Sequence, residues 1–378
     1  MRRTGVGVVV TCIVILVGVA AGIFALRGAA DEKGYAEPWT PPRGALFGYP
    51  VAEPSGHAIV RALIGNIEHT PPGETIRIVG YSFTLRDVAE ALVAAHDRGV
   101  RVQVVLNGHS RQFRAVELLL RELGSDASMR SFLVLTGNSA RGADGRGVTH
   151  QKSWSFSRTG DARYVVMAGS MNLTYLSTGQ YTDVYSYVGR RDVWRAFDAV
   201  FRRQVRDEPM ASPAMTRRLG RDRAYFFPGF SPAEEPIYRT LRGLPDRGTT
   251  IRVVMHAWHS ERGHRLASLL ASKARAGARV EVVEGLHVGG GVRAQLLAGG
   301  VRLHPGVFKN GDHIHNKLML ADYVRDGRRH RLVSTGSDNW GQLSLSNDDL
   351  VLMLDAGPKR YRQYVAFYER LRARADTE

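Results

Sequence analysis

The sequence contains little cysteine and little lysine. Cys12 is the only cysteine, which excludes a disulfide bond within the chain. Six lysines stand beside 46 arginines, and no run of five or more basic residues occurs. The basic charge is therefore spread along the chain and is not gathered in one basic tail.

The size and charge of the chain limit what it can be. With 378 residues, of which 44% are hydrophobic and 23% charged, it has the composition of a globular protein large enough for two domains. The net charge of +16 favours polyanionic partners, either nucleic acid or acidic lipid head groups. An arginine-rich genome would give the same charge without such a partner, and the sequence leaves both explanations open.

An uncharged apolar run occupies residues 5–26, between Arg3 and Arg27. A run of this length can span a bilayer, whereas the core of a signal peptide is usually about 7–15 residues long. Residues 1–34 are therefore predicted to be a signal peptide, cleaved after Ala30, or a transmembrane anchor. Either would export the rest of the chain, as a secreted protein or one tethered to the outer face of the cytoplasmic membrane.

The chain repeats a strand–helix–strand pattern. In each copy a strand rich in β-branched residues precedes a helix that ends at a glycine, and a second strand follows. The copies cover residues 75–106 and 250–283. Such units form parallel strands covered by helices. We therefore predict an α/β fold of two similar halves, each a mostly parallel mixed sheet flanked by helices, at residues 35–205 and 225–378 with a linker at 206–224.

The first half contains an additional Gly-rich segment, TGNSARGADGRGV (136–148). The stretch from Arg101 to His150 exceeds the equivalent stretch from Arg279 to His315 by the length of this segment. The segment is predicted to be a loop near the functional site. The sequence leaves open whether this loop is a lid that contacts substrate or a surface insertion.

Two of the six lysines stand two positions after a histidine. These are Lys152 after His150 and Lys317 after His315. On a strand, residues i and i+2 face the same side, so each imidazole would lie beside an ammonium group. Lysine neutralises phosphate charge, and histidine attacks phosphorus or moves a proton near neutral pH. The pattern predicts phosphate chemistry.

A Gly-Ser-x-Asn sequence follows each of these pairs at a similar spacing. GSMN (169–172) follows Lys152, and GSDN (336–339) follows Lys317. We expect each to return on a neighbouring strand and to offer hydrogen-bond donors to the same phosphate oxygens. The expected donors are Ser170, Asn172, Ser337 and Asn339.

These residues resemble the signature of the phospholipase D superfamily, a duplicated HxKxxxxD followed by GSxN. HNKLMLAD (315–322) matches fully and ends in Asp322, whereas HQKSWSFS (150–157) has Ser157 where the family has aspartate. The similarity covers nearly all of the chain after residue 55. In the family this aspartate mainly braces the motif strand, so the resemblance implies a structural role for Asp322 and Ser157. A degenerate first half is the other interpretation of Ser157.

The resemblance implies that both motifs meet between two halves related by a pseudo-two-fold axis, and that the reaction needs no metal or cofactor. One histidine attacks the phosphodiester to form a phosphohistidine, and the other protonates the leaving alcohol and then activates water or another alcohol. By analogy with single-chain members, His150 would be the nucleophile and His315 the general acid and base. The duplicated geometry permits the reverse assignment.

Each histidine needs a carboxylate that orients its ring and stabilises its charged form. Asp183 follows His150 in YTDVY (181–185), and Asp349 follows His315 at nearly the same spacing in NDDLV (347–351). These positions parallel acidic residues with that role in the superfamily, so each histidine is expected to have the acid of its own half. Asp348 is the competing choice in the second half.

Three more histidines are candidates for substrate contact. His313 would share the face of His315, while His256 and His259 flank Trp258 at the end of a strand, where ligands approach parallel sheets. Each can equally be an ordinary surface histidine. None shows a metal-ligand pattern with cysteine or carboxylate residues.

The leading hypothesis is an exported, metal-independent phosphodiesterase that hydrolyses phospholipids and can transfer the phosphatidyl group to an alcohol. A nuclease of the same superfamily is the alternative enzyme, because the positive charge would serve nucleic acid equally well. A catalytically impaired module that binds anionic membranes is the third hypothesis, and only Ser157 favours it. The predicted partner is a phospholipid or membrane surface, or else nucleic acid; we expect no protein partner and a monomer with an internal pseudo-dimer.

Overall fold

The computed structural model describes residues 38–50 and 57–377. The predicted signal peptide or anchor at 5–26 lies outside the described residues. Within those residues, no helix is both long enough and apolar enough to cross a bilayer. Trp39–Glu378 forms one unit, so the two predicted halves are not separate bodies.

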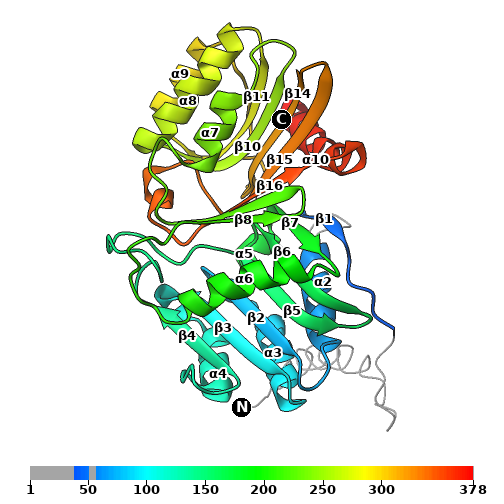
Figure 1. Ribbon diagram of the computed structural model, residues 1–378. Helices are drawn as coiled ribbons and strands as arrows, with labels where there is room; N and C mark the ends of the chain where they lie inside the picture. Colours follow the sequence, from blue (N-terminus) through cyan, green and yellow to red (C-terminus); the bar gives the residue numbers. More distant parts are fainter. Residues whose placement is uncertain (1–37, 51–56, 378) are drawn as a thin grey trace, which may run out of the picture. The chain divides into compact units, whose positions relative to one another are not determined.

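The first half is built around an eight-stranded sheet (Figure 1). Its order is β1-β7-β6-β5-β2-β3-β4, and β13 of the second half also pairs with β7. The strands are β1 (Gly44–Gly48), β2 (Thr75–Gly80), β3 (Arg101–Asn107), β4 (Phe132–Thr136), β5 (Ser153–Thr159), β6 (Ala162–Gly169), β7 (Gln180–Tyr187) and β13 (His313–Ile314). One face is covered by α2 (Ala58–Glu68), α3 (Arg86–Asp97) and α4 (Arg114–Leu123), and the other by α6 (Arg191–Gln204). Two short elements are the 3-10 helix η1 (Gly108–Gln112) and α5 (Tyr175–Thr178).

The second half has its own eight-stranded sheet, in the order β12-β11-β10-β14-β15-β16-β9-β8. The strands are β8 (Met215–Leu219), β9 (Asp222–Phe226), β10 (Thr250–Trp258), β11 (Arg279–Val288), β12 (Arg302–Pro305), β14 (Lys317–Arg325), β15 (Arg328–Gly336) and β16 (Leu350–Asp355). One face is covered by α7 (Pro236–Gly243), α8 (Ser260–Arg275) and α9 (Gly290–Ala298), and the other by α10 (Pro358–Thr377). The 3-10 helix η2 (Gln342–Leu345) follows β15.

The predicted α/β fold with two similar halves is confirmed, and the two predicted units are β2-α3-β3 and β10-α8-β11. The sheets are less parallel than expected. Parallel pairing among the main strands is confined to β2-β3-β4 and β10-β11-β12. The strands that follow the motifs, β5 and β14, continue into β6 and β15 through short turns, which only antiparallel strands allow. The segment predicted as a linker, 206–224, contains β8 and therefore contributes to the second sheet.

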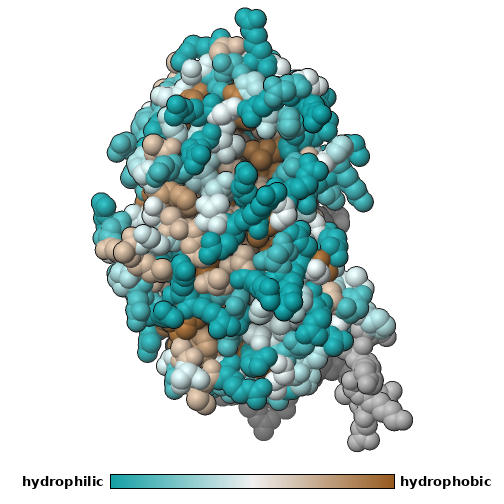
Figure 2. Space-filling model, viewed as in Figure 1, coloured by the Kyte–Doolittle hydropathy of each residue, from teal (hydrophilic) through white to brown (hydrophobic). Residues whose placement is uncertain are grey.

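One hydrophobic cluster spans both halves, beside the cluster that each half has of its own. Phe197 of α6 lies against Phe226 of β9, with ring centroids 5.2 Å apart, and Phe367 of α10 stacks on Phe47 of β1 at 4.5 Å. Each contact joins residues of different halves, so neither half buries all its apolar surface without the other. The surface seen in Figure 2 is mostly hydrophilic with small apolar patches, as expected for a chain with a net charge of +16.

The Gly-rich segment 136–148 is fixed between the halves. Arg141 is fully buried and its Nε lies 2.5 Å from Oδ1 of Asp348, which is fully buried too. The same guanidinium donates hydrogen bonds to the carbonyl oxygens of Pro213, at 2.8 Å, and Phe227. Opening this loop would leave a buried charge without its partner, which opposes movement. The segment is thus neither a free lid nor a mere surface insertion.

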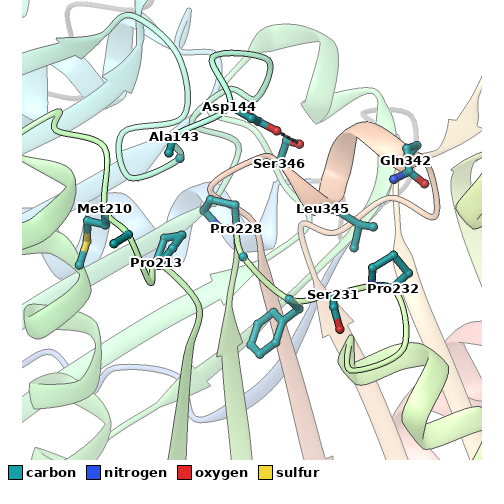
Figure 3. Close-up of a pocket in the computed structure, with 14 residues that line it drawn as sticks. Ala143, Asp144, Met210, Pro213, Pro228, Ser231, Pro232, Gln342, Leu345 and Ser346 are labelled. Atoms are coloured by element: carbon teal, nitrogen blue, oxygen red, sulfur yellow. Dashed lines mark hydrogen bonds between the residues drawn. The ribbon is translucent and has the colours of Figure 1, made fainter.

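The same loop is also held by close backbone packing. A Cβ on Gly147 would lie 1.9 Å from the carbonyl oxygen of Ser346, so no larger residue fits there. Asp144 accepts a hydrogen bond from the Ser346 hydroxyl across the same contact (Figure 3). A cavity of about 420 Å³ adjoins this contact, and its apolar lining includes Met210, Pro213, Pro228, Phe230 and Leu345.

We expect Arg141→Ala to lower the free energy of unfolding by about 3–5 kcal/mol, because Asp348 would remain buried without its counter-ion. Arg146→Ala is the matched control: Arg146 lies in the same loop, but its side chain is 79% exposed. It should change stability by less than about 0.5 kcal/mol. Urea denaturation measures both. Similar losses in the two variants would contradict the role given to Arg141.

Candidate active site

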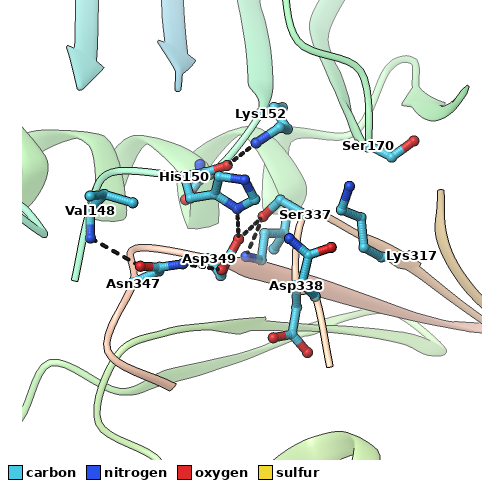
Figure 4. Close-up of polar contacts among 12 residues, drawn as sticks. Val148, His150, Lys152, Ser170, Lys317, Ser337, Asp338, Asn347 and Asp349 are labelled. Atoms are coloured by element: carbon cyan, nitrogen blue, oxygen red, sulfur yellow. Dashed lines mark hydrogen bonds and ion pairs between the residues drawn. The ribbon is translucent and has the colours of Figure 1, made fainter. Parts of the chain in front are cut away.

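The two His-x-Lys motifs are bound through their backbones to the opposite half of the molecule. The N–H groups of His150 and Gln151 donate to the carbonyl oxygen of Asp348, at 3.0 and 2.6 Å. The N–H of His315 donates to the carbonyl oxygen of Tyr181 at 2.8 Å. These bonds place side chains of both motifs at one contact between the halves (Figure 4).

His150 is paired with a carboxylate from the second half. Its Nδ1 lies 2.7 Å from Oδ1 of Asp349, which is fully buried and also accepts a hydrogen bond from Ser337 at 2.6 Å. The expectation that each histidine has the acid of its own half is wrong here, because the backbone bonds hold His150 against the residues that precede β16. The contact favours Asp349 over Asp348, since Asp348 binds Arg141.

His315 is oriented differently. Its Nδ1 donates to the carbonyl oxygen of Ser170 at 2.9 Å, and among the described residues no carboxylate contacts its ring. Asp183 instead accepts hydrogen bonds from Asn316 at 2.6 Å, from the Ser170 hydroxyl at 3.1 Å and from Thr335. Asp183 therefore holds the residues around His315 and not the imidazole of either histidine.

Both lysines are buried beside their histidines. Nζ of Lys152 donates to the carbonyl oxygen of His150 at 2.5 Å, and Nζ of Lys317 donates to that of His315 at 2.6 Å. Burial lowers the pKa of Lys152 to about 7. Burial and the nearby charge of Lys152 lower the pKa of Lys317 as well.

The histidine pKa values are lowered for the same reasons. Burial and the Lys152 charge bring the pKa of His150 to about 4, and burial and the Lys317 charge hold the pKa of His315 well below its usual value. Four basic groups thus share a buried cluster, and in the part of the chain that the structure describes Asp349, at His150, is the one carboxylate in contact with any of them. A phosphodiester anion would supply the missing negative charge and favour protonation of the cluster.

The two GSxN serines are engaged within the protein. Ser170 and Ser337 are fully buried, and each hydroxyl donates to the acid of its own half, at 3.1 and 2.6 Å. In this arrangement the hydroxyls hold the acids in place, and their expected donation to phosphate stays a prediction. Asn172 and Asn339 are half-buried, and within the described chain no hydrogen bond engages Nδ2 of either, so both amides remain candidates to donate to a phosphate oxygen.

The aspartate missing from the first motif is replaced by a neighbouring carboxylate. The Ser157 hydroxyl accepts a hydrogen bond from the Thr75 N–H at 2.8 Å and donates to Glu74 at 2.6 Å. In the second half Asp322 binds two arginines at 3.2 Å each, and Thr249 stands at the position equivalent to Glu74. The carboxylate thus comes from the residue just before the adjacent strand, β2, which supports a structural role for Ser157 and Asp322.

Several residues at the site were not predicted from the sequence. Tyr81 lies beside His150, with ring centroids 5.1 Å apart, and the ring centroid of His109 lies 4.2 Å from that of Tyr81. The repeat could have indicated both. Tyr81 follows TIRIVG as His256 follows TIRVVM, and His109 and His287 take equivalent places near the end of the next strand of each unit.

The roles of Glu74 and Arg141 were hidden for another reason. They depend on strand register and on contacts between the halves, which the sequence does not display.

The other candidate histidines occupy different places. His256 lies 4.4 Å from His315 between ring centroids, and His313 lies 6.3 Å from His256. His259 is exposed, and its ring contacts Ser260. Across the described ranges, no three His, Cys, Asp or Glu side chains are grouped so as to hold a metal ion.

Removing the Lys152 ammonium should stabilise the protein. Its pKa of about 7 in the folded state lies below the ordinary 10.5, so between these values the unfolded chain binds more protons and stability falls as pH falls. We expect Lys152→Met to raise Tm over wild type, by more at pH 7 than at pH 10.5. Lys359→Met, at an exposed position of α10, should give no gain at either pH. Calorimetry at both pH values checks this, and a larger gain at the higher pH would show that the sign is wrong.

A family model described as "Cardiolipin synthase, PLD-like domain" matches residues 63–205. No curated protein matches the chain. Among solved structures, the chain is similar to phosphatidylserine synthase from Haemophilus influenzae Rd KW20, at 10% identity and a TM-score of 0.60, over 88% of this chain and 87% of that one. It is also similar to polyphosphate kinase from Porphyromonas gingivalis, at 14% identity and a TM-score of 0.55, over 86% of this chain but only 50% of the kinase.

The phospholipase D family member Nuc from Salmonella typhimurium is 22% identical over 42% of this chain and 92% of that one, with a TM-score of 0.32. At these sequence identities, the similarity to phosphatidylserine synthase and to polyphosphate kinase shows a shared fold only. The family model and the duplicated motif concern the residues that carry the chemistry. The match over residues 63–205, together with the motif that recurs in the second half, supports a place in the phospholipase D superfamily, whose members typically hydrolyse or transfer phosphodiesters.

Proposed function

We propose that this protein is a phospholipase D-type phosphodiesterase that acts on phospholipids through a phosphohistidine at His150. The observation that carries the proposal is the 2.7 Å contact between Nδ1 of His150 and Asp349. It leaves Nε2 of His150 free to attack phosphorus. The carboxylate then stabilises the positive charge that the ring gains when the N–P bond forms and the bond to the leaving oxygen breaks.

His315 suits the complementary role of general acid and base. A carbonyl oxygen orients its ring, so its neutral form is not disfavoured as it would be beside a carboxylate. When a phosphodiester anion offsets the Lys317 charge, the pKa of His315 rises and the ring can protonate the leaving alcohol. It then takes a proton from water or another alcohol, whose oxygen bonds to phosphorus as the N–P bond breaks.

Exposed apolar side chains support a membrane surface as the place of action. Tyr175 and Leu176, 58% and 69% exposed, follow GSMN, and Leu343, 50% exposed, follows GSDN. They lie on α5 and η2, at equivalent places in the two halves. Large exposed apolar residues that recur beside a site mark contact with lipid or protein. The predicted export segment and the net positive charge favour the same surface.

The positive charge also keeps a nuclease as the second candidate function. The impaired-module hypothesis is weaker, because Glu74 supplies the carboxylate that Ser157 lacks. The names of the matched family model and of the phosphatidylserine synthase refer to phospholipid enzymes, which supports lipid over nucleic acid.

The two acids should differ in their effect on turnover. Asp349→Asn removes the charge that contacts His150, and we expect kcat/KM for a phosphodiester to fall about ten-thousandfold. Asp183→Asn acts through the neighbours of His315 and should lower it about 10- to 100-fold. Steady-state kinetics with a soluble short-chain phospholipid compares them. Equal losses, or a larger loss at Asp183, would contradict the assigned roles.

The substrate is tested by incubating the full chain, in detergent and with EDTA, with vesicles of phosphatidylcholine, vesicles of phosphatidylglycerol and plasmid DNA. We expect head-group release from lipid, no nicking of DNA, and loss of both lipid activities in His150→Ala. In wild-type protein quenched during turnover, a phosphatidyl group on His150 should be detectable by mass spectrometry, whereas His315→Ala should form little of it because the leaving alcohol is not protonated. DNA nicking without lipid turnover would select the nuclease, and binding without turnover would select the impaired module.

In the same assay, Leu176→Ser combined with Leu343→Ser should lower turnover of vesicles more than turnover of the soluble lipid. Val324→Ser is the control, because Val324 is exposed on β14 at the end away from Lys317. If the double variant lowers turnover of vesicles and of the soluble lipid equally, Leu176 and Leu343 do not act in binding the membrane surface.

A further inference from the structure

We propose that His256 and His287 form a second phosphate subsite beside His315. The alcohol that leaves or enters at His315 would then carry a phosphate of its own. This inference rests on the proposed function, because it concerns the group that His315 protonates.

The two histidines extend from His315 toward the surface. The rings of His315 and His256 are 4.4 Å apart, and those of His256 and His287 are 5.1 Å apart, measured between centroids. His256 is half-buried at the end of β10, and His287 is exposed at the end of β11. These strands are parallel, and ligands commonly bind at the carboxyl ends of parallel strands.

The equivalent pair in the first half is closed. Tyr81 and His109 occupy these positions beside His150. Both ring nitrogens of His109 are engaged within the protein, Nδ1 with Asn107 at 2.6 Å and Nε2 with Ser82 at 2.7 Å. On that side of the site, no imidazole nitrogen of this pair is left for a ligand.

The second half lacks both of these polar partners, because Gly285 and Ala257 stand in their places. A Cβ on Gly285 would lie 2.6 Å from Cα of His256, so a polar side chain has no room there. Nδ1 of His256 lies 3.0 Å from the carbonyl oxygen of Ile314. Over the residues that the structure describes, no hydrogen bond reaches Nε2 of His256 or either nitrogen of His287. These nitrogens are available to a ligand.

The surroundings favour an anion. Lys317, His315 and His313 face the same group of rings, and all three are basic. The acids next to them in sequence are already paired: Glu284 binds Arg293, and Asp312 binds Arg374. A phosphomonoester dianion is a ligand that can accept hydrogen bonds from two neighbouring imidazoles and whose charge suits these basic surroundings.

The position of the subsite says which part of the substrate it binds. In the proposed mechanism His315 protonates the leaving oxygen, so a group beyond that oxygen lies on the His256 side. The second phosphate therefore belongs to the leaving alcohol or to the acceptor that replaces it. A phospholipid with a phosphorylated head group has this chemistry.

The subsite is tested first by binding alone, with the full chain and two small probes, 1,3-propanediol bisphosphate and n-propyl phosphate. The two equivalent ends of the bisphosphate give a twofold preference by themselves. By calorimetry we expect the bisphosphate to bind wild type at least tenfold more tightly than n-propyl phosphate does. In His287→Gln this preference should fall to about twofold. His330→Gln, an exposed histidine on β15, should keep the full preference. A twofold preference in wild type, or one unchanged in His287→Gln, would overturn the subsite.

Turnover then tests the substrate class. In mixed micelles we expect kcat/KM to be about tenfold higher for phosphatidylglycerol phosphate than for phosphatidylglycerol, and this ratio to approach one in His287→Gln. If only a DNA oligonucleotide shows dependence on His287, the lipid assignment is overturned. If no phosphodiester is turned over, the proposed function fails, whereas the binding preference still decides the subsite.

Discussion

The backbone hydrogen bonds from His150 and Gln151 to the carbonyl oxygen of Asp348 are the contact on which the rest of the site depends. They hold the first motif against the dipeptide Asp348 and Asp349, whose side chains bind different groups. Asp349 takes the ring of His150, while Asp348 takes the buried guanidinium of Arg141. The dipeptide therefore contacts both the loop of Arg141, which holds the two halves together, and the ring of His150, the proposed nucleophile. Stability and chemistry cannot be altered independently at this point.

The duplicated fold offers two nearly equal histidines to a reaction that needs two different ones. The structure distinguishes them by small changes around a common plan: His150 receives a carboxylate, and His315 receives a carbonyl oxygen. The rings that pack against the two histidines differ as well: Tyr81 lies beside His150, and His256 lies beside His315. An internal repeat can thus supply a nucleophile and an acid from one ancestral pattern, because few substitutions suffice to separate their electrostatics.

The sequence predicts what is local or duplicated. The strand–helix–strand units, the two His-x-Lys motifs and Asp349 could be found because each depends on short spacing or on a constant repeat offset. The partner of His150 could not, since it lies 199 residues away and the offset alone points to the acid of the same half. Glu74 was hidden for a related reason, because its contact with Ser157 follows from the register of β2 against β5.

Because the buried cluster has more basic groups than carboxylates in contact with them, its protonation depends on whether an anionic substrate is bound. Burial lowers the pKa values of Lys152 and His150, so without an anion the cluster holds fewer protons than its residues would in water. A phosphodiester that binds there favours the charged forms, so binding should be coupled to proton uptake. His315 would then become a competent acid when there is a leaving group to protonate. The burial that lowers these pKa values also lowers the stability of the free protein. It thereby makes acid catalysis by His315 depend on a bound substrate.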